Sequence, residues 1–326
     1  MLYNFRHAIE TMNQWGSQRI PFLFFIDFEM KAIQLYRTDI ALPSHVAFAF
    51  PTSAQNTSPK KVNKKYHFRK YPVSFIQYQQ AFAESGKQIR AGNTFLLNLT
   101  FPTMLETNLT IREIYEYSWA KYKILVEGEF VCFSPETFVT IRDGYIASYP
   151  MKGTIKASVP EAAEKILNNS KETAEHHTIV DLIRNDLSMV ATDVTVKRFR
   201  YVDRIATSEG DILQVSSEII GKLPENYNNN LGNIIFTLLP AGSVTGAPKH
   251  KTIEIIRSIE KTERGYYTGI CGHFDGQNLD SAVMIRFIEV QDDETLWFRS
   301  GGGITCNSDL ESEYHELIDK VYVPFV

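Results

Sequence analysis

The chain of 326 residues has 44% hydrophobic and 22% charged residues, close to the average of folded globular proteins, which excludes wholesale disorder. Its net charge of −4 gives no basis for a general nucleic-acid binder, and its longest apolar run, PFLFFI, is too short to span a bilayer. Three widely spaced cysteines without a CxxC pair fit a reducing compartment, so we expect a cytoplasmic protein without a zinc site.

The first seventy residues are predicted to form a short N-terminal segment that ends in an exposed basic connector. The stretch PTSAQNTSPKKVNKK after residue 50 is rich in Ser, Asn, Pro and Lys, a composition typical of solvated loops. Residues 71–326 are predicted to form one larger domain. In it, helical and strand patterns alternate, which predicts a mixed α/β fold.

The clearest elements of this domain come early and are read from periodicity. A 3.6-residue pattern predicts a helix over 75–89, and an apolar run predicts a strand over 93–101. Two short apolar runs over 137–149 are separated by Asp143 and Gly144, a pair that favours a tight hairpin turn.

A long helical pattern over 171–191 places carboxylates on its apolar face. The apolar stripe consists of Ile179, Ile183, Leu187 and Val190. Glu172 and Glu175 continue the same stripe three residues apart. Because burying an unpaired charge is costly, these carboxylates need a metal ion or a cationic side chain as partner.

The region 238–261 contains the segment GSVTGAPK between an apolar stretch and an amphipathic helical pattern. We expect a strand, then a turn, then a helix whose free N–H groups can face an anion. A second glycine-rich segment, RSGGGITCNSD, is predicted to be a turn in which the backbone comes close to a bound group. Each segment taken alone also fits a simple tight turn.

The last helical pattern repeats the arrangement of paired carboxylates. Ser308 and Glu311 are spaced like a capping box, and one helical face then carries Glu313, Glu316, Leu317 and Lys320. Four carboxylates without His or Cys are typical of a hard-cation site, with Mg²⁺ preferred when water and an anionic ligand complete the shell. Solvated ion pairs explain the same spacing, so spacing alone leaves both interpretations open.

Seven segments, in chain order, resemble the motifs of the chorismate-utilising enzyme family. They are SPETF at 134–138, PMKGT at 150–154, EHHTIVDLIRNDL at 175–187, GSVTGAPK at 242–249, RGYYTG at 264–269, SGGGI at 300–304 and SDLESEYHELIDK at 308–320. The resemblance covers about residues 72–322. It implies two α/β subdomains whose largely antiparallel sheets face each other around a deep active-site cleft, with helices outside.

Within that family, the lysine of PMKGT, Lys152, resembles the lysine that the aminodeoxychorismate synthase component I branch has at this position. The resemblance implies that Lys152 adds to ring carbon C2 of chorismate while the C4 hydroxyl leaves, and that ammonia then attacks C4 and expels the lysine. It implies Glu136 as the acid that protonates the leaving hydroxyl. The expected product is 4-amino-4-deoxychorismate, a precursor of para-aminobenzoate and folate.

The resemblance also implies a metal and a substrate cradle. Mg²⁺ is expected on Glu175 and Glu316, with Glu172 and Glu313 supporting the ligands, where the ion neutralises the ring carboxylate. The residues expected to hold the substrate carboxylates are Thr245, Tyr267, Arg286, Gly301, Gly303 and Lys320.

Two positions depart from the family pattern. Leu96 stands where a polar residue is usual, which disfavours water activation, and Gln214 stands where a histidine is linked to pyruvate elimination in relatives that form anthranilate. The N-terminal region is shorter than in many relatives, which leaves a tryptophan or feedback pocket in doubt.

The source of ammonia is expected to be a separate glutamine amidotransferase subunit. The turn around Cys271 lacks the final glycine of a glutaminase nucleophile turn, so Cys271 is expected to be structural. No lyase domain follows residue 326, so another enzyme is expected to form para-aminobenzoate.

Three alternatives stay open at this point. They are anthranilate synthase component I, an isochorismate or salicylate synthase, and a non-catalytic subunit that senses chorismate or binds a partner.

Overall fold

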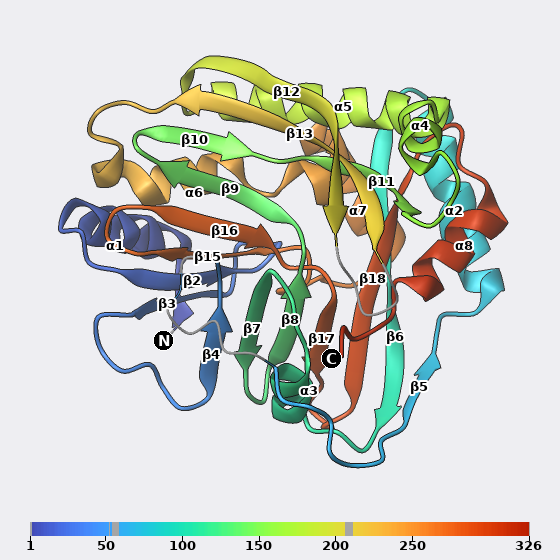
Figure 1. Ribbon diagram of the computed structural model, residues 1–326, viewed down its shortest axis with the longest axis horizontal. Coiled ribbons are helices and arrows are strands. Elements are labelled where there is room, and N and C mark those ends of the chain that lie inside the picture. Colours follow the sequence, from blue (N-terminus) through green and yellow to red (C-terminus); the bar gives the residue numbers. More distant parts are fainter. Residues whose placement is uncertain (1, 52, 54–58, 206–210, 326) are drawn as a thin grey trace.

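The computed structural model describes residues 2–51, 53, 59–205 and 211–325, and within these it forms two antiparallel sheets (Figure 1). Neighbouring strands of the first, ten-stranded sheet are β1 (Leu2–Tyr3), β3 (Ile33–Arg37), β2 (Phe22–Ile26), β15 (Ile270–Phe274), β16 (Leu279–Val283), β9 (Thr137–Arg142), β10 (Tyr145–Ser148), β13 (Ile212–Lys222) and β11 (Met151–Lys156), with β12 (Thr192–Ile205) also paired to β13.

The second, eight-stranded sheet completes the predicted pair of antiparallel sheets. Its neighbouring strands are β14 (Gly246–Ala247), β6 (Leu96–Thr107), β18 (Leu296–Ile304), β17 (Phe287–Val290), β8 (Phe130–Ser134), β7 (Tyr122–Val126) and β4 (Val46–Ala49), with β5 (Phe68–Tyr71) also paired to β6. The predicted fold class, mixed α/β with largely antiparallel sheets, is therefore confirmed.

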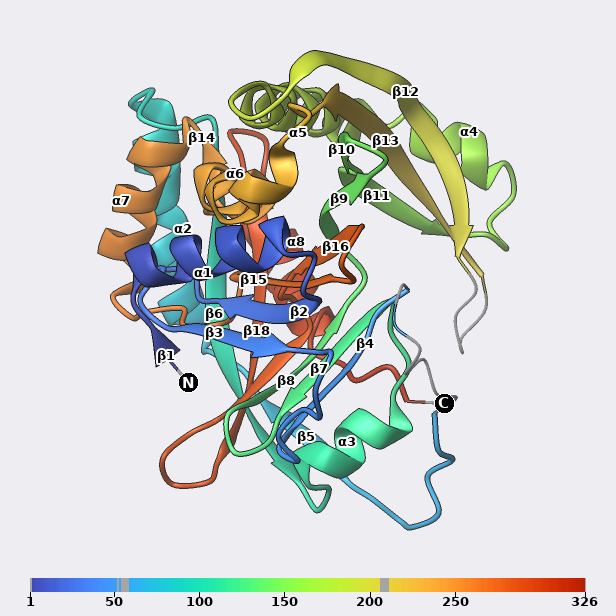
Figure 2. The same ribbon diagram turned by 90° about the vertical axis from the view of Figure 1, so that its left-hand side faces the viewer.

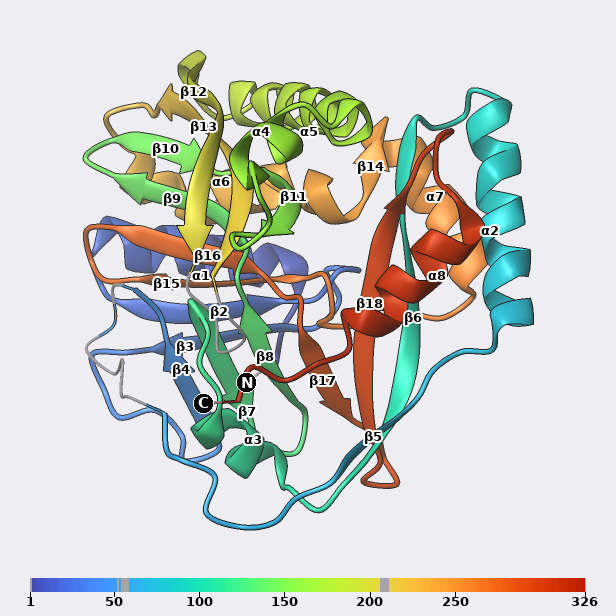
Figure 3. The same ribbon diagram turned by 45° about the vertical axis from the view of Figure 1, so that its right-hand side comes forward.

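Helices cover the outer sides of both sheets. They are α1 (Phe5–Ser17), α2 (Phe75–Arg90), α3 (Ile111–Tyr117), α4 (Ala162–Leu167), α5 (Ser170–Ser188), α6 (Leu231–Leu238), α7 (Lys249–Glu260) and α8 (Leu310–Asp319), with the 3-10 turns η1 (Tyr227–Asn230) and η2 (Gly242–Val244). Figure 2 shows α1, α5 and α6 together beside the first sheet, and Figure 3 shows α2, α7 and α8 beside β6 and β18. No described helix is both long and apolar enough to cross a membrane.

Strand β2, the FLFFI run, lies between two hydrophobic cores. Phe22, Phe24 and Ile26 pack into the core under α1, α5 and α6, whereas Leu23 and Phe25 pack into a core shared with β4, β7, β8 and β17 of the second sheet. Because successive strand residues point to opposite faces, a strand buried on both sides is apolar throughout. The two sheets therefore face each other across an apolar layer.

The N-terminal seventy residues contribute strands to both sheets. Strand β2 pairs with β15, β4 pairs with β7, and β5 pairs with β6. The boundary proposed near residue 70 stays a prediction.

Most elements expected from periodicity are confirmed. Helices α2 and α5 and strand β6 occupy the predicted regions, and β9 and β10 form the predicted hairpin. At its turn, Asp143 and Gly144 both have positive φ, 51° and 78°, as the tight turn requires.

Three local predictions are wrong. The apolar stretch before GSVTGAPK ends a buried helix, α6, rather than a strand, because a short apolar run has no period that separates the two. The glycines of RSGGG lie within strand β18 and pair with β6, so they form no turn. The N-cap of α8 is Asp309, whose side chain accepts from the Ser312 N–H, and Ser308 donates to Glu313 instead of forming a capping box with Glu311.

Candidate active site

Strand β11 holds the predicted nucleophile. Lys152 lies opposite Val215 of β13, and a bulge follows at Gly153, whose φ of 78° suits glycine. The Lys152 Nζ atom is 3.4 Å from Glu175 Oε2, and the lysine side chain is only 24% exposed. A Cβ atom on Gly153 would lie 3.4 Å from Glu172 Oε2, so the bulge lets α5 approach closely. Lys152 follows the hairpin predicted over 137–149, and strand β11, which carries it, was not predicted.

Helix α5 presents its carboxylates as its apolar stripe predicted. Ile179, Ile183 and Leu187 are buried in the first core. One turn before them, Glu175 is 10% exposed, and its Oε1 atom is buried without a hydrogen-bond partner in the described structure. A buried carboxylate oxygen without a donor is a position that a cation fits.

Strand β18 brings glycine backbone next to the lysine. A Cβ atom on Gly303 would lie 3.5 Å from Lys152 Nζ and 3.1 Å from Leu96 Cδ1, and one on Gly301 would lie 2.8 Å from the Leu99 carbonyl oxygen. A side chain at Gly303 would fill the space beside the amine, and one at Gly301 would collide with β6. Gly303 therefore faces the Lys152 amine with backbone alone, whereas Gly301 lets β18 lie close to β6.

Helix α8 reaches the same glycine stretch from the other side. Lys320 donates from Nζ to the Gly301 carbonyl at 2.8 Å and lies 2.6 Å from Glu316 Oε1. Glu313 is 4% exposed, accepts a hydrogen bond from Ser308 and has its Oε2 atom 3.4 Å from the Cβ position of Gly302. Glu316 is half exposed.

The four predicted metal ligands thus lie on two helices at opposite sides of the lysine and glycine stretch. No cluster of three or more His, Cys, Asp or Glu side chains suited to a metal occurs among the residues that the structure describes. Mg²⁺ is commonly held by only one or two protein carboxylates, with water and substrate oxygens completing the shell. The all-carboxylate donors and the unpartnered Glu175 oxygen fit such an ion.

Glu136, the predicted proton donor, lies between β8 and β9. Burial raises the pKa of its carboxyl, while the Ser243 hydroxyl, which donates to Oε1 at 2.5 Å, and the positive charges of Lys152, Arg286 and Lys320 act to lower it. Three predicted cations are therefore near enough to influence the predicted proton donor. A raised pKa suits a carboxyl that must hold a proton near neutral pH.

Arg286 has a buried N–H group that lacks an acceptor in the described structure. Its backbone has a φ of 54°, unusual for a residue with a side chain, and its Nε atom is buried without a hydrogen-bond partner in the described ranges. Its guanidinium lies 5.1 Å from the centre of the Tyr322 ring. A carboxylate would supply the missing acceptor.

Two predicted substrate contacts, Thr245 and Tyr267, are deeply buried, and their role toward the substrate stays a prediction. Thr245 is fully buried and its hydroxyl donates to the Ala241 carbonyl at 2.8 Å, so it is not free to donate to a ligand. Tyr267 is 3% exposed, packs in the core between the sheets beside Phe287, and burial raises the pKa of its phenol.

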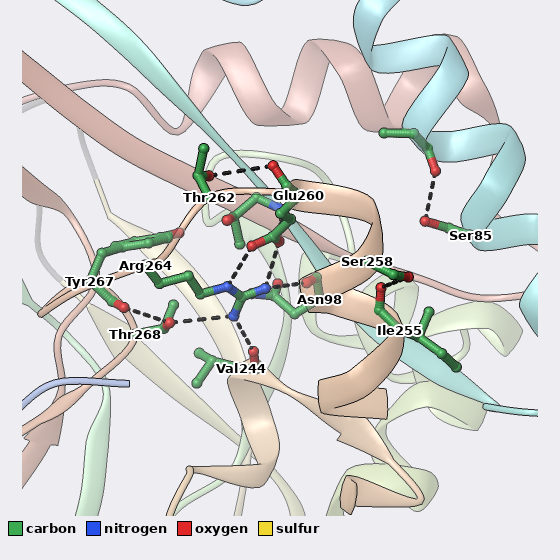
Figure 4. Close-up of polar contacts among 12 residues, drawn as sticks. Ser85, Asn98, Val244, Ile255, Ser258, Glu260, Thr262, Arg264, Tyr267 and Thr268 are labelled. Atoms are coloured by element: carbon green, nitrogen blue, oxygen red, sulfur yellow. Dashed lines mark hydrogen bonds and ion pairs between the residues drawn. The ribbon is translucent and has the colours of Figure 1, made fainter. Parts of the chain in front are cut away.

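Arg264 is the residue that sequence analysis missed, although the quoted motif RGYYTG begins with it. It is 2% exposed and donates to both Glu260 carboxylate oxygens (Figure 4). Its other donors reach the carbonyls of Asn98 and Val244 and the Thr268 hydroxyl. The Arg264 side chain links β6, η2 and α7 to the loop that carries Tyr267. Because its donors are hydrogen-bonded, this buried arginine holds these segments in place.

Leu96 and Gln214, the two departures, lie near the lysine. Leu96 is buried on β6 beside Gly303, so this wall is apolar. Gln214 on β13 pairs with Thr154, two residues beyond Lys152. Cys271 is fully buried on β15 and burial raises the pKa of its thiol, which fits the structural role expected for it.

Comparison with known proteins identifies the family of this chain. Residues 24–325 match the model of the family described as chorismate binding enzyme. A Haemophilus influenzae protein named as an uncharacterized PabA-like protein is 51% identical and covers 98% of this chain and 97% of its own length. The anthranilate synthase component 1 of Archaeoglobus fulgidus is 32% identical over 74% of this chain and 60% of its own length.

Two further comparisons extend the family likeness. The aminodeoxychorismate synthase component 1 of Bacillus subtilis is 29% identical over 77% of this chain and 55% of its own length. Among solved structures, the menaquinone-specific isochorismate synthase of Escherichia coli superposes with a TM-score of 0.75 and 16% identity, covering 98% of this chain and 82% of that one. That likeness shows a shared fold.

Proposed function

Because this chain belongs to the chorismate-binding enzyme family, we propose that it is the chorismate-aminating component of an aminodeoxychorismate synthase. The observation that carries the proposal is Lys152, whose amine lies beside Glu175 and the glycine stretch of β18 and whose charge acts on Glu136. A partly buried lysine close to a buried acid is an arrangement that suits a nucleophile and a proton donor.

The first half-reaction joins the lysine to the substrate. The neutral Lys152 amine forms a bond to C2 of the ring, the ring double bond shifts, and the C4–O bond breaks. Glu136 gives its proton to the departing oxygen, which leaves as water, and becomes a carboxylate. The raised pKa of the buried Glu136 supports this role.

The second half-reaction releases the product. Ammonia forms a bond to C4, the double bond shifts back, and the bond between C2 and Lys152 breaks with its electron pair returning to the lysine nitrogen. The Glu136 carboxylate takes one proton from the new ammonium group. The net change replaces the hydroxyl of chorismate by an amine and yields water.

The remaining groups bind and orient the substrate. Arg286 offers its unpartnered Nε to a substrate carboxylate, and Lys320 supplies a second positive charge beside Gly301. Mg²⁺, held by Glu175 and Glu316 with Glu172 and Glu313 in support, supplies charge neutralisation at the ring carboxylate when bound. The apolar Leu96 wall offers no base to activate water, which favours ammonia as the nucleophile.

We propose a separate glutamine amidotransferase as the ammonia source and the cytoplasm as the location. The buried Cys271 has no free thiolate for a glutaminase reaction, which supports a partner for that step. The matched relative in Haemophilus influenzae carries a PabA-like name, which does not assign an activity to this chain.

The test is the identity of the product. The protein is incubated with chorismate, Mg²⁺ and an ammonium salt, and the product is identified by mass spectrometry. We expect 4-amino-4-deoxychorismate, which keeps its enolpyruvyl group, and none with Lys152→Ala. Anthranilate indicates an anthranilate synthase, isochorismate or salicylate indicates water as nucleophile, and no reaction indicates a non-catalytic subunit; each outcome contradicts the proposal.

A further inference from the structure

A small cavity borders Glu136, the C-terminal half of α5 and the end of α6. It is lined by the beginning of β9, the end of β10, the C-terminal half of α5 and the chain from Leu238 to Ser243. Its volume is about 30 Å³. One water-sized molecule needs about 10–15 Å³ measured in this way, so the cavity takes one or two such molecules and excludes a ring.

The polar walls of the cavity are acidic. On one side lies Glu136 with its Ser243 partner, and on the other lies Asp186, whose Oδ2 is 2.7 Å from Lys249 Nζ. Burial raises the pKa of both carboxyls. Apolar side chains such as Ile183 and Leu187 cover much of the rest. Carboxyl oxygens accept hydrogen bonds, so this lining favours a small molecule that donates them and disfavours an anion.

The position of the cavity connects it with the nucleophile. In the proposed reaction, ammonia must reach C4, the carbon whose hydroxyl Glu136 protonates, so it must arrive beside the Glu136 carboxyl. At that moment the substrate is held covalently by Lys152. The cavity borders the Glu136 carboxyl and also Tyr149 and Pro150, shortly before Lys152 in the chain, and ammonia has nearly the size of water.

We propose that this cavity is the ammonia pocket of the enzyme. The inference rests on the proposed function, since it assigns the second substrate of that reaction to a place. Ammonia held there donates to the carboxyl oxygens of the walls, forms its bond to C4 as Lys152 leaves, and passes one proton to Glu136. Asp186, which lines the pocket, is paired with Lys249.

Substitutions that fill the cavity test the proposal. Ala241 is 2% exposed and lines the cavity, and Ala241→Val adds two methyl groups there. Ile183→Phe fills it independently from α5. Ala147→Val is the matched control, because Ala147 is buried next to the cavity-lining Ser148 but is not part of the lining.

Two readouts separate the half-reactions. The first is formation of the Lys152–substrate adduct from chorismate without ammonium, which we expect to be unchanged in every variant. The second is the KM for ammonium, which we expect to rise about tenfold in both filling variants, close to the most that one non-hydrogen atom contributes to binding. The KM for ammonium in Ala147→Val should match that of the wild type.

An enlarging substitution covers the case in which the filling variants do not fold. Ile183→Ala is expected to accept methylamine as nucleophile, which the wild type does not use. The proposal is overturned when folded filling variants keep the wild-type KM for ammonium, or when Ile183→Ala gains no methylamine reaction. A wild type that forms no aminated product contradicts the proposed function itself, which is a different result.

Discussion

Replacing Arg264 by Met is expected to destabilise the protein strongly, because the guanidinium of Arg264 is one of the most deeply buried charges in the described structure. Its side chain and that of Glu260 are 2% and 3% exposed, and two hydrogen bonds of 2.8 and 2.7 Å join them. In Arg264→Met, the Thr100 N–H is the one hydrogen-bond donor left to the Glu260 carboxylate in the described structure, and the carbonyls of Asn98 and Val244 lose a donor. Breaking a buried pair from one side costs about 3–5 kcal/mol.

Urea unfolding followed by circular dichroism measures this cost. We expect Arg264→Met to lower the free energy of unfolding by about 3–5 kcal/mol, a large part of the ~5–15 kcal/mol that is typical of folded domains. The double variant Arg264→Met/Glu260→Leu should recover part of the loss, since apolar replacement of both partners is often nearly neutral. Arg257 is exposed on α7, the helix that carries Glu260. Arg257→Met is therefore the control and should change stability by less than about 0.5 kcal/mol. A loss of unfolding free energy in Arg264→Met no larger than that in Arg257→Met would contradict the importance of this buried pair.

Three further predictions concern the site and the core. Glu136→Gln should lower kcat by about 10²–10⁴-fold. Because burial raises the pKa of the Glu136 carboxyl, wild-type kcat should be high at low pH and fall as pH rises through that pKa. A pH profile of kcat should show this fall for the wild type and not for the variant. Arg286→Lys keeps the charge but loses the planar fork, so titration of initial rates should show the KM for chorismate raised by about tenfold or more, and an unchanged KM would contradict the assigned contact. Burial raises the pKa of Asp27 from 3.8 to about 6, so its ionisation costs stability that is retained below pH 3.8 and lost as pH rises through 6. Thermal unfolding of Asp27→Asn should therefore show a gain of up to about 3 kcal/mol at pH 8 and little gain at pH 4, whereas an equal gain at both pH values would refute this.

Long periodic segments of the sequence predicted the fold well. The stripe of α5 placed Ile179, Ile183 and Leu187 in the core and brought Glu175 inward beside Lys152. The Asp143–Gly144 pair fixed the hairpin of β9 and β10. These features depend on local chemistry, so a single sequence contains enough information to find them.

The features that sequence analysis missed depend on contacts between distant segments. Gly301 and Gly303 belong to a strand because β6 pairs with them, and no local pattern shows that pairing. Ser243 meets Glu136, and Arg264 meets Asn98, across more than one hundred residues. The end of helix α6 was not predicted because the apolar run that closes it is too short to separate a helical period from a strand period.

The measurement closest to the central claim is the intact mass of the protein after incubation with chorismate and Mg²⁺ in the absence of ammonium. A covalent lysine mechanism predicts a mass gain equal to chorismate less one water, located on Lys152 by peptide mapping and lost when ammonium is added. An unmodified Lys152 during turnover, together with full ammonium-dependent activity of Lys152→Ala, would show that the amine of this residue takes no part in the chemistry.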